Sequence, residues 1–329
     1  MNKLPSITIF FCQIVTTEFV CVDGAKIKVC NSLGNGFNDC VHGSNESKLI
    51  CDERNCNKKH CKCGITAPLV TPLIVHGWAL EKQKWPWHAT LYSLQHRYWT
   101  FWCGGSLISE KAVVTAAHCV WSLKATTIKV GLGKHFRNFE KVDPGLIFDV
   151  AQIIIQPLYQ DLVGNYGSDI AILILKKSVK FSENIRPVCI DWKEKDFTRS
   201  LDNSTLGMIV GLGITEKDEY SNTLKATYLP VVPDTKCIET QKRDFKKYVT
   251  LSTFCAGWRN GTGVCNGDSG GGLVFDKYKN KTWVLEGIVS VSPRRLGTSF
   301  CDTNYFTIFT KVGMYVDWIK NVLNISTES

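Results

Sequence analysis

The stretch GDSGGG, residues 267–272, decides how this chain of 329 residues is interpreted. Two more strings stand upstream of it, TAAHC at residues 115–119 and SDIAIL at residues 168–173. A serine hydroxyl is a weak nucleophile at neutral pH, so it needs an imidazole to take its proton and a buried carboxylate to fix that imidazole's tautomer. The three strings offer one candidate for each role, in the order His118, Asp169 and Ser269.

Each string alone is a weak signal, because a histidine beside a cysteine on a strand is usually structural and Asp-Ser-Gly-Gly can be a turn. Together they are a strong signal. The order His, Asp, Ser differs from the orders found in subtilisins and α/β-hydrolases.

The surroundings of these strings predict a β-rich fold. After Pro72 the chain consists of short strand-like runs broken by turns, such as WHATLYSL, FDVAQIII and TWVLEGIVSV, which favour a barrel or a sandwich. The exception is MYVDWIKNVL near the end, where Tyr315, Trp318, Ile319 and Val322 have helical spacing.

From Ile74 to its end the chain resembles the trypsin-like serine proteases, which have the chymotrypsin fold. The resemblance rests on the three strings and on CGGSLI at residues 103–108, PVCI at 187–190, FCAG at 254–257 and GIVS at 287–290. It implies an all-β fold of two six-stranded antiparallel β-barrels with a C-terminal helix, here preceded by a small disulfide-rich module.

The resemblance also implies roles for residues. His118 would be the general base, Asp169 the orienting carboxylate and Ser269 the nucleophile, while the backbone amides of Gly267 and Ser269 would form the oxyanion hole. No cofactor and no metal are expected. Lys134 stands where calcium-binding relatives have a glutamate, so we expect no calcium in the protease domain.

The stretch IVHG at residues 74–77 resembles the start of a mature protease. In this family the amino group released by cleavage, here at the Leu73–Ile74 bond, turns inward and pairs with the aspartate before the catalytic serine, Asp268. A buried ammonium–carboxylate pair needs both partners, so the chain is expected to be a zymogen. The alternative is that IVHG is only the start of a strand.

Counting residues back from Ser269 in the GDSGGG string gives the expected position of the specificity pocket. Gly263 lies at the floor, six residues before Ser269, and Ser292 and Thr307 align with the two wall positions. A floor without a carboxylate disfavours Lys and Arg, because an unpaired buried charge is costly. The walls should narrow the pocket toward Leu, Val, Ala or Met. This matches Leu73, so the sequence predicts that one copy activates another.

Family-type pairing implies four disulfides, and the last of them would keep the N-terminal part attached after cleavage. They are Cys103–Cys119, Cys237–Cys255, Cys265–Cys301 and Cys63–Cys189.

Residues 19–52 resemble a degenerate LDL-receptor class A repeat, with residues 53–73 as a cysteine-containing linker and activation peptide before a protease domain at 74–329. The repeat implies the bridges Cys21–Cys40 and Cys30–Cys51, which leave Cys56–Cys61 by default. Its calcium cage would keep only Asp39 and Glu46, so calcium there would be weak or absent. A cysteine-rich propeptide of other ancestry is the alternative.

Residues 1–18 are expected to be a signal peptide, with an N-terminal strand of an incorrect gene start as the alternative. Fifteen cysteines and five Asn-x-Ser/Thr sequons predict a secreted, extracellular glycoprotein. The net charge of +9 is scattered along the chain, which argues against nucleic-acid binding. No run of 18 apolar residues occurs, so no membrane span is expected.

Together these features predict a secreted zymogen of a serine endopeptidase with elastase-like or Leu-preferring specificity. They resemble the modular serine proteases that begin arthropod immune cascades. The expected partners are protein substrates, a downstream zymogen and a pattern-recognition protein bound through the N-terminal module. A digestive elastase-like protease and a non-catalytic homologue that acts as a binding protein are the alternatives.

Overall fold

The structure, a computed structural model, divides the chain into two units, Met1–Cys61 and Lys62–Ser329, which are described separately. For residues 11–15, 18–23, 26–31 and 78–79 only the backbone is described. The described residues are 11–15, 18–23, 26–31, 63–66, 78–79, 85–143, 145–193, 205–215, 217–277 and 282–325.

In the first unit the described residues form an antiparallel sheet of three strands, β1 (Phe11–Val15), β2 (Glu18–Asp23) and β3 (Lys26–Asn31). β1 lies within the segment expected to be a signal peptide. The expected bridges Cys21–Cys40, Cys30–Cys51 and Cys56–Cys61 each include a cysteine outside the described residues.

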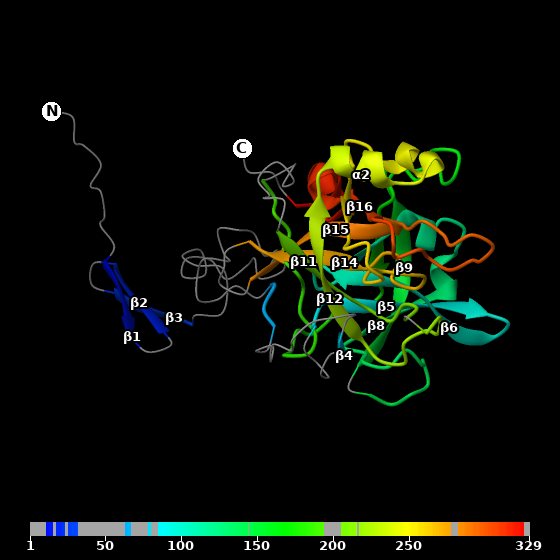
Figure 1. Ribbon diagram of the computed structural model, residues 1–329. Helices are drawn as coiled ribbons and strands as arrows, with labels where there is room; N and C mark the ends of the chain where they lie inside the picture. The colour runs from blue at the N-terminus through cyan, green and yellow to red at the C-terminus, as the bar shows by residue number, and fades with distance from the viewer. Residues whose placement is uncertain are drawn as a thin grey trace. The chain divides into compact units, whose positions relative to one another are not determined.

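The second unit begins with a closed antiparallel barrel, whose strands follow the order β10-β7-β6-β5-β8-β9 (Figure 1). Alternating apolar residues on these strands, such as Leu91, Val130 and Ile172, point inward and are at most 1% exposed. The strands are β5 (His88–Gln95), β6 (Tyr98–Leu107), β7 (Ala112–Thr115), β8 (Ile128–Leu132), β9 (Leu146–Ile155) and β10 (Ala171–Leu175).

A second barrel follows, in the order β11-β14-β15-β16-β13-β12, and it closes because β11 also pairs with β12. The short strand β4 (Trp78–Ala79) adds to its edge beside β12. The expected pair of six-stranded antiparallel barrels is confirmed. The strands are β11 (Leu206–Gly211), β12 (Lys225–Val232), β13 (Thr253–Ala256), β14 (Gly272–Asp276), β15 (Trp283–Val291) and β16 (Thr307–Lys311).

Helices are few and short. The predicted helix at the end is present as the 3-10 turn η6 (Val312–Tyr315) followed by α3 (Val316–Val322), with Val316 and Ile319 buried. In the described part of the chain no helix is long and apolar enough to cross a membrane. The other helices are η2 (Ala117–Cys119), η3 (Ala125–Thr127), α2 (Asp234–Thr240) and η5 (Arg243–Tyr248).

Four disulfides join the pairs that the resemblance implied, Cys63–Cys189, Cys103–Cys119, Cys237–Cys255 and Cys265–Cys301. The first holds residues 63–66 against the second barrel. Gly64 donates to Pro187 O at 2.8 Å and accepts from Trp283 N at 2.8 Å. Its φ is +65°, and an added Cβ would lie 2.4 Å from Trp283 O, so only glycine fits.

Candidate active site

Strand pairing in the first barrel brings His118 and Asp169 together. β7 leads into η2, which carries His118, and Asp169 stands two residues before β10, whose Ala171 pairs with Thr115 of β7. Asp169 is completely buried. Its carboxylate accepts the backbone N–H of His118 at 2.9 Å and lies 2.8 Å from His118 Nδ1. The imidazole is therefore held in one orientation, with Nδ1 toward the carboxylate.

The second barrel also holds Asp169. Ser290 of β15 donates its hydroxyl to Asp169 Oδ2 at 2.5 Å, and Thr310 of β16 donates to the Asp169 carbonyl at 3.0 Å. The sequence analysis gave neither residue a role at the site. The string GIVS, which ends in Ser290, was the available signal.

The electrostatics of His118 favour its protonated form. Burial by itself lowers the pKa of His118, but the charge of Asp169 and its hydrogen bond to the ring act in the opposite direction, and Asp161 adds a smaller effect. The net result is a pKa above the ordinary value of 6.5. Such an imidazole is a stronger base for a proton taken at Nε2.

Ser269 belongs to the turn that leads into β14. Its carbonyl accepts the backbone N–H of Gly104 at 2.8 Å, and an added Cβ on Gly270 would lie 2.2 Å from Thr115 Oγ1. The turn thus lies directly against the end of β7, three residues before His118. No hydrogen bond between the Ser269 hydroxyl and His118 occurs among the described contacts, and the described partner of His118 Nε2 is Cys119 Sγ at 3.7 Å.

The backbone amides of Gly267 and Ser269 have no acceptor among the described residues. Gly267 has a φ of +96°, a conformation that L side chains rarely adopt, and its Cα faces the rings of Phe101 and Tyr220. Both N–H groups are open to an oxygen atom of a ligand.

Asp268 is partly buried beside this turn. Its carboxylate accepts the backbone N–H of Gly213 at 2.8 Å and of Cys265 at 2.9 Å. An added Cβ on Gly211 or Gly213 would lie 2.0 or 2.3 Å from a carboxylate oxygen. Burial raises the pKa of Asp268 to about 6, although the two hydrogen bonds lower it in part. The expected activation residues Leu73 and Ile74 lie outside the described residues.

The expected pocket residues Ser292 and Thr307 lie side by side, because β15 and β16 pair Val291 with Ile308. Their hydroxyl oxygens are 3.0 Å apart. At Gly263 an added Cβ would meet the Thr303 side chain at 3.3 Å. The sequence analysis did not identify Thr303, because it lies in an irregular loop between Cys301 and β16.

The described residues include one cluster of side chains of the types that bind metal ions. The atoms that lie close enough belong to Cys103, His118 and Cys119, but the two cysteines form a disulfide and offer no thiolate. In the loop after β8, Lys134 Nζ lies 3.2 Å from Asp143 and donates to Lys141 O at 2.9 Å. An ammonium group therefore lies among oxygen atoms in this loop.

Two β-barrels that meet at a His–Asp pair and a Gly-Asp-Ser-Gly-Gly turn define the class of trypsin-like serine proteases. A family model described as trypsin matches residues 74–319, and the chain belongs to this family.

Similar proteins include Limulus clotting factor C of Carcinoscorpius rotundicauda, which is 37% identical over 277 residues, covering 79% of this chain and 26% of that protein. Clotting factor G beta subunit of Tachypleus tridentatus is 30% identical, covering 87% of this chain and 89% of that protein. Melanization protease 1 of Drosophila melanogaster is 31% identical, covering 75% and 65%. The chain spans about a quarter of the length of the clotting factor C relatives.

Proposed function

We propose that the protein is a secreted serine endopeptidase made as a zymogen. The observation that carries this proposal is the buried Asp169, which orients His118 by two contacts and is itself held by Ser290. In the proposed reaction Ser269 Oγ attacks the scissile carbonyl carbon while His118 Nε2 takes the hydroxyl proton. The amides of Gly267 and Ser269 receive the negative oxygen of the tetrahedral intermediate.

The intermediate collapses when the C–N bond breaks and His118 gives its proton to the leaving amine. A water molecule then attacks the acyl-enzyme, again with His118 as the base, and frees Ser269. The raised pKa of His118 supports both steps, because the ring accepts a proton readily and the nearby carboxylate stabilises the imidazolium.

The proposed specificity is for a small or medium apolar side chain, with leucine foremost. In this proposal Gly263 would supply no negative charge at the floor, and the hydroxyls of Ser292 and Thr307, which lie 3.0 Å apart, would form the walls. A buried arginine would lose its water without gaining a partner, which costs several kcal/mol.

A peptide library tests this specificity. We expect the mature enzyme to cleave after Leu, Val, Ala or Met and not after Lys, Arg or Trp. The triple variant Gly263→Asp with Ser292→Gly and Thr307→Gly should accept Arg, whereas Gly263→Asp alone should accept it poorly because the walls remain. Cleavage after Arg by the unchanged enzyme would contradict the proposal.

Activation is proposed to occur by cleavage between Leu73 and Ile74, after which the new amino group pairs with Asp268. The support is the chemistry of Asp268, a partly buried carboxylate that accepts two backbone N–H groups and has its pKa raised to about 6, so that an ammonium group would stabilise its charged form. Leu73 fits the proposed pocket, so one copy of the protein would cleave another. If the Ser269→Ala zymogen were cut at its usual rate, self-activation would be refuted.

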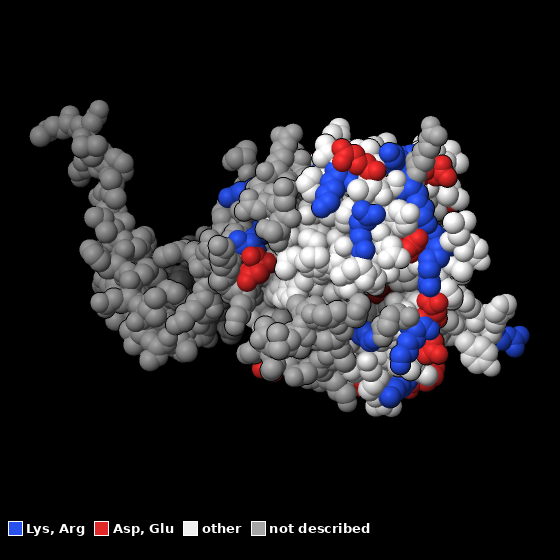
Figure 2. All heavy atoms as spheres, in the orientation of Figure 1, with Lys and Arg blue, Asp and Glu red and all other residues white. Residues whose placement is uncertain are grey.

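The physiological role is proposed from the relatives. The names of three of them refer to clotting or melanization. We therefore propose that the protein starts or relays an innate-immune proteolytic cascade, with a downstream zymogen as substrate and a pattern-recognition protein bound through the N-terminal module. Figure 2 shows Lys and Arg side chains near Asp and Glu side chains on the face in view, which supports protein partners over nucleic acid.

Extracellular location is proposed from the four disulfides, which persist in oxidising compartments. N-glycans are proposed at the sequons. Of these, Asn260 lies exposed in a turn where its side chain accepts the Thr262 backbone N–H at 3.0 Å. The other sequons are at Asn45, Asn203, Asn280 and Asn324.

A fluorophosphonate probe, which reacts with an activated serine, tests the central proposal. After cleavage at Leu73 the protein should be labelled at Ser269, and Ser269→Ala and His118→Ala should not be. Absence of labelling in cleaved protein with an intact fold would favour a non-catalytic binding protein.

A further inference from the structure

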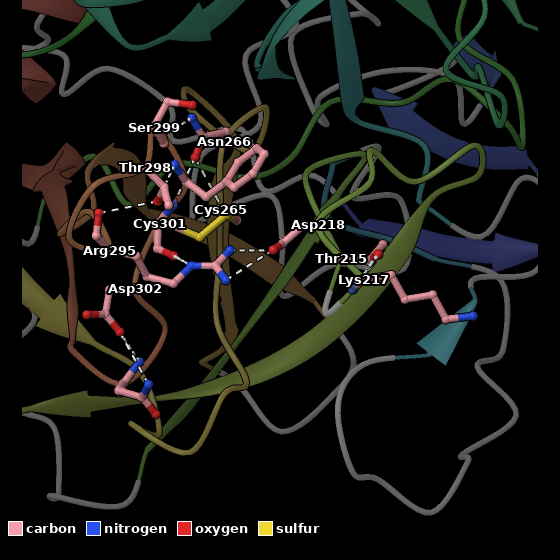
Figure 3. A network of polar contacts seen from close by, with 12 residues as sticks. Thr215, Lys217, Asp218, Cys265, Asn266, Arg295, Thr298, Ser299, Cys301 and Asp302 are labelled. Atoms are coloured by element: carbon pink, nitrogen blue, oxygen red, sulfur yellow. Dashed lines mark hydrogen bonds and ion pairs between the residues drawn. A yellow bond between two sulfur atoms is a disulfide. The ribbon is translucent and has the colours of Figure 1, made fainter.

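Three segments of the second barrel meet beside the turn that carries Gly267 and Ser269. They are residues 213–221, residues 263–268 and residues 293–301, and the disulfide Cys265–Cys301 joins the last two (Figure 3). Residues of all three segments line one cavity, and the partly buried Asp268 lies on its wall. Under the proposed function this is the cavity that would receive Ile74.

Asn266 connects the other two segments to the turn. Its Nδ2 donates to Ser299 O at 3.0 Å, and its Oδ1 accepts the Cys301 backbone N–H at 3.1 Å. Its backbone carbonyl accepts the Ile214 N–H at 3.0 Å. Because Asn266 directly precedes Gly267, these three bonds restrain the peptide group that carries the Gly267 amide.

Arg295 joins the outer two segments. Its guanidinium binds both oxygens of Asp218, with Nη1 at 3.2 Å from Oδ2, and its Nε donates to Cys301 O at 3.0 Å (Figure 3). Such two-pronged pairing fixes the relative orientation of the groups more firmly than a single contact. The hydrogen bond from Arg295 lowers the pKa of Asp218, so the carboxylate stays charged near neutral pH.

None of these bonds uses the Ile74 amino group as a partner. We infer that Asn266 and the Arg295–Asp218 pair hold the oxyanion-hole turn in position before activation, so that the uncleaved chain already has proteolytic activity. This inference rests on the proposed function and extends it, because self-activation needs a first cleavage by an uncleaved copy. Asn266, Arg295 and Asp218 are positioning residues, since none is argued to touch the substrate.

The test uses one variant in two forms. Residues 69–73 are replaced by Asp-Asp-Asp-Asp-Lys, so that the protein cannot cut itself but enteropeptidase releases Ile74. The rates of fluorophosphonate labelling and of leucyl-peptide hydrolysis are measured before and after enteropeptidase treatment. We expect measurable rates before cleavage and higher rates after it.

Substitutions in this background then separate positioning from folding. Asn266→Ala removes two hydrogen bonds and should lower the rates of the uncleaved form by about tenfold. Arg295→Ala should lower them by about threefold, because the ion pair is half-exposed. After cleavage both losses should shrink to less than about twofold, since the Ile74–Asp268 pair then also holds the turn.

Two control variants test whether the loss of rate is specific to the Arg295–Asp218 pair. Lys217→Ala removes a charge from the same turn as Asp218, but its side chain points away from the network in Figure 3, so it should change neither form. The exchange Arg295→Asp with Asp218→Arg should restore much of the rate lost in Arg295→Ala.

The outcomes are distinct. Equal losses in both forms would overturn the inference, because they indicate a general folding role. An unreactive uncleaved form beside a reactive cleaved form would also overturn it, while the proposed function would stand. If neither form reacts, the proposed function itself fails.

Discussion

At the scale of single residues, the site depends on how two aspartates differ. Asp169 is completely buried, binds the His118 ring and accepts the Ser290 hydroxyl, so its charge acts directly on the imidazole. Asp268 is partly buried, its carboxylate accepts two backbone N–H groups among the described residues, and desolvation raises its pKa to about 6. The first can orient a base at neutral pH, whereas the second needs an additional positive charge to remain ionised without cost.

Replacing Asp169 by asparagine should lower kcat by about 10⁴, because the amide no longer selects the tautomer in which Nε2 can accept a proton. The acid limb of the pH–rate profile should also move to lower pH, since Asp169 is what raises the pKa of His118. Steady-state kinetics between pH 5 and 9 check both.

Asp161→Asn is the matched control for this prediction. Asp161 raises the pKa of His118 only through its charge, as the smallest contribution. The acid limb should therefore move slightly in the same direction without a loss of kcat. A large loss in Asp161→Asn, or a small one in Asp169→Asn, would contradict the assignment of Asp169.

Asp268 should make the uncleaved protein more stable as the pH falls. Its pKa is raised in the folded state, so its contribution is fully present below pH 4 and is lost as the pH rises through about 6. The change should amount to about 3 kcal/mol between pH 7 and pH 4. Chemical denaturation of the Ser269→Ala zymogen across this range measures it.

Asp268→Asn supplies the comparison, because the amide does not titrate. The difference in stability between the two proteins should vary with pH before cleavage and should vary much less after cleavage releases the Ile74 amino group. If the stability difference between the two uncleaved proteins did not vary with pH, Asp268 would already be paired with a cation before cleavage.

At the scale of elements, the loop after β8 contains a buried charge pair. Asp143 accepts backbone N–H groups of His135, Phe136 and Gly145 and also binds Lys134, and both side chains of the pair are almost fully buried. The loop is therefore closed by groups of the chain itself.

Lys134→Met should destabilise the protein by about 3–5 kcal/mol, because it leaves the Asp143 carboxylate buried without its partner. Lys129→Ala is the control, since the Lys129–Asp149 pair is exposed, and it should cost less than about 1 kcal/mol. Thermal unfolding measures both. Equal effects would mean that burial does not govern the Lys134 pair, and a fall in melting temperature on adding EGTA to the unchanged protein would reveal a calcium site.

Much of the fold was predictable at this scale. The β-rich runs, the three motif strings and the helical spacing around Trp318 correspond to the two barrels and the C-terminal helix. The contacts of Asn266, Arg295 and Thr303 could not be predicted, because they depend on how irregular loops that are distant in the sequence fold onto each other. The position of Gly263 could be found from the sequence by counting six residues back from Ser269. The sequence could not show that the pairing of β15 with β16 brings Ser292 beside Thr307.

At the scale of the whole molecule, cleavage at Leu73 should not separate the two pieces. Cys63 lies before the proposed cut and is bonded to Cys189 beyond it. When the Ser269→Ala protein is cut by active enzyme, one band should remain on a non-reducing gel and two should appear after reduction. The double variant Cys63→Ser with Cys189→Ser should give two bands without reduction, and two bands from the unchanged bridge would contradict the prediction.

Besides the Cys63–Cys189 disulfide, two backbone hydrogen bonds of Gly64, to Pro187 and Trp283, hold residues 63–66 on the protease domain. If the N-terminal module binds a surface, the mature enzyme would remain bound to that surface and would not diffuse away. Proteolysis by this enzyme would then occur only close to the bound surface. The distance over which the cascade spreads would depend on diffusion of the downstream protease that it activates.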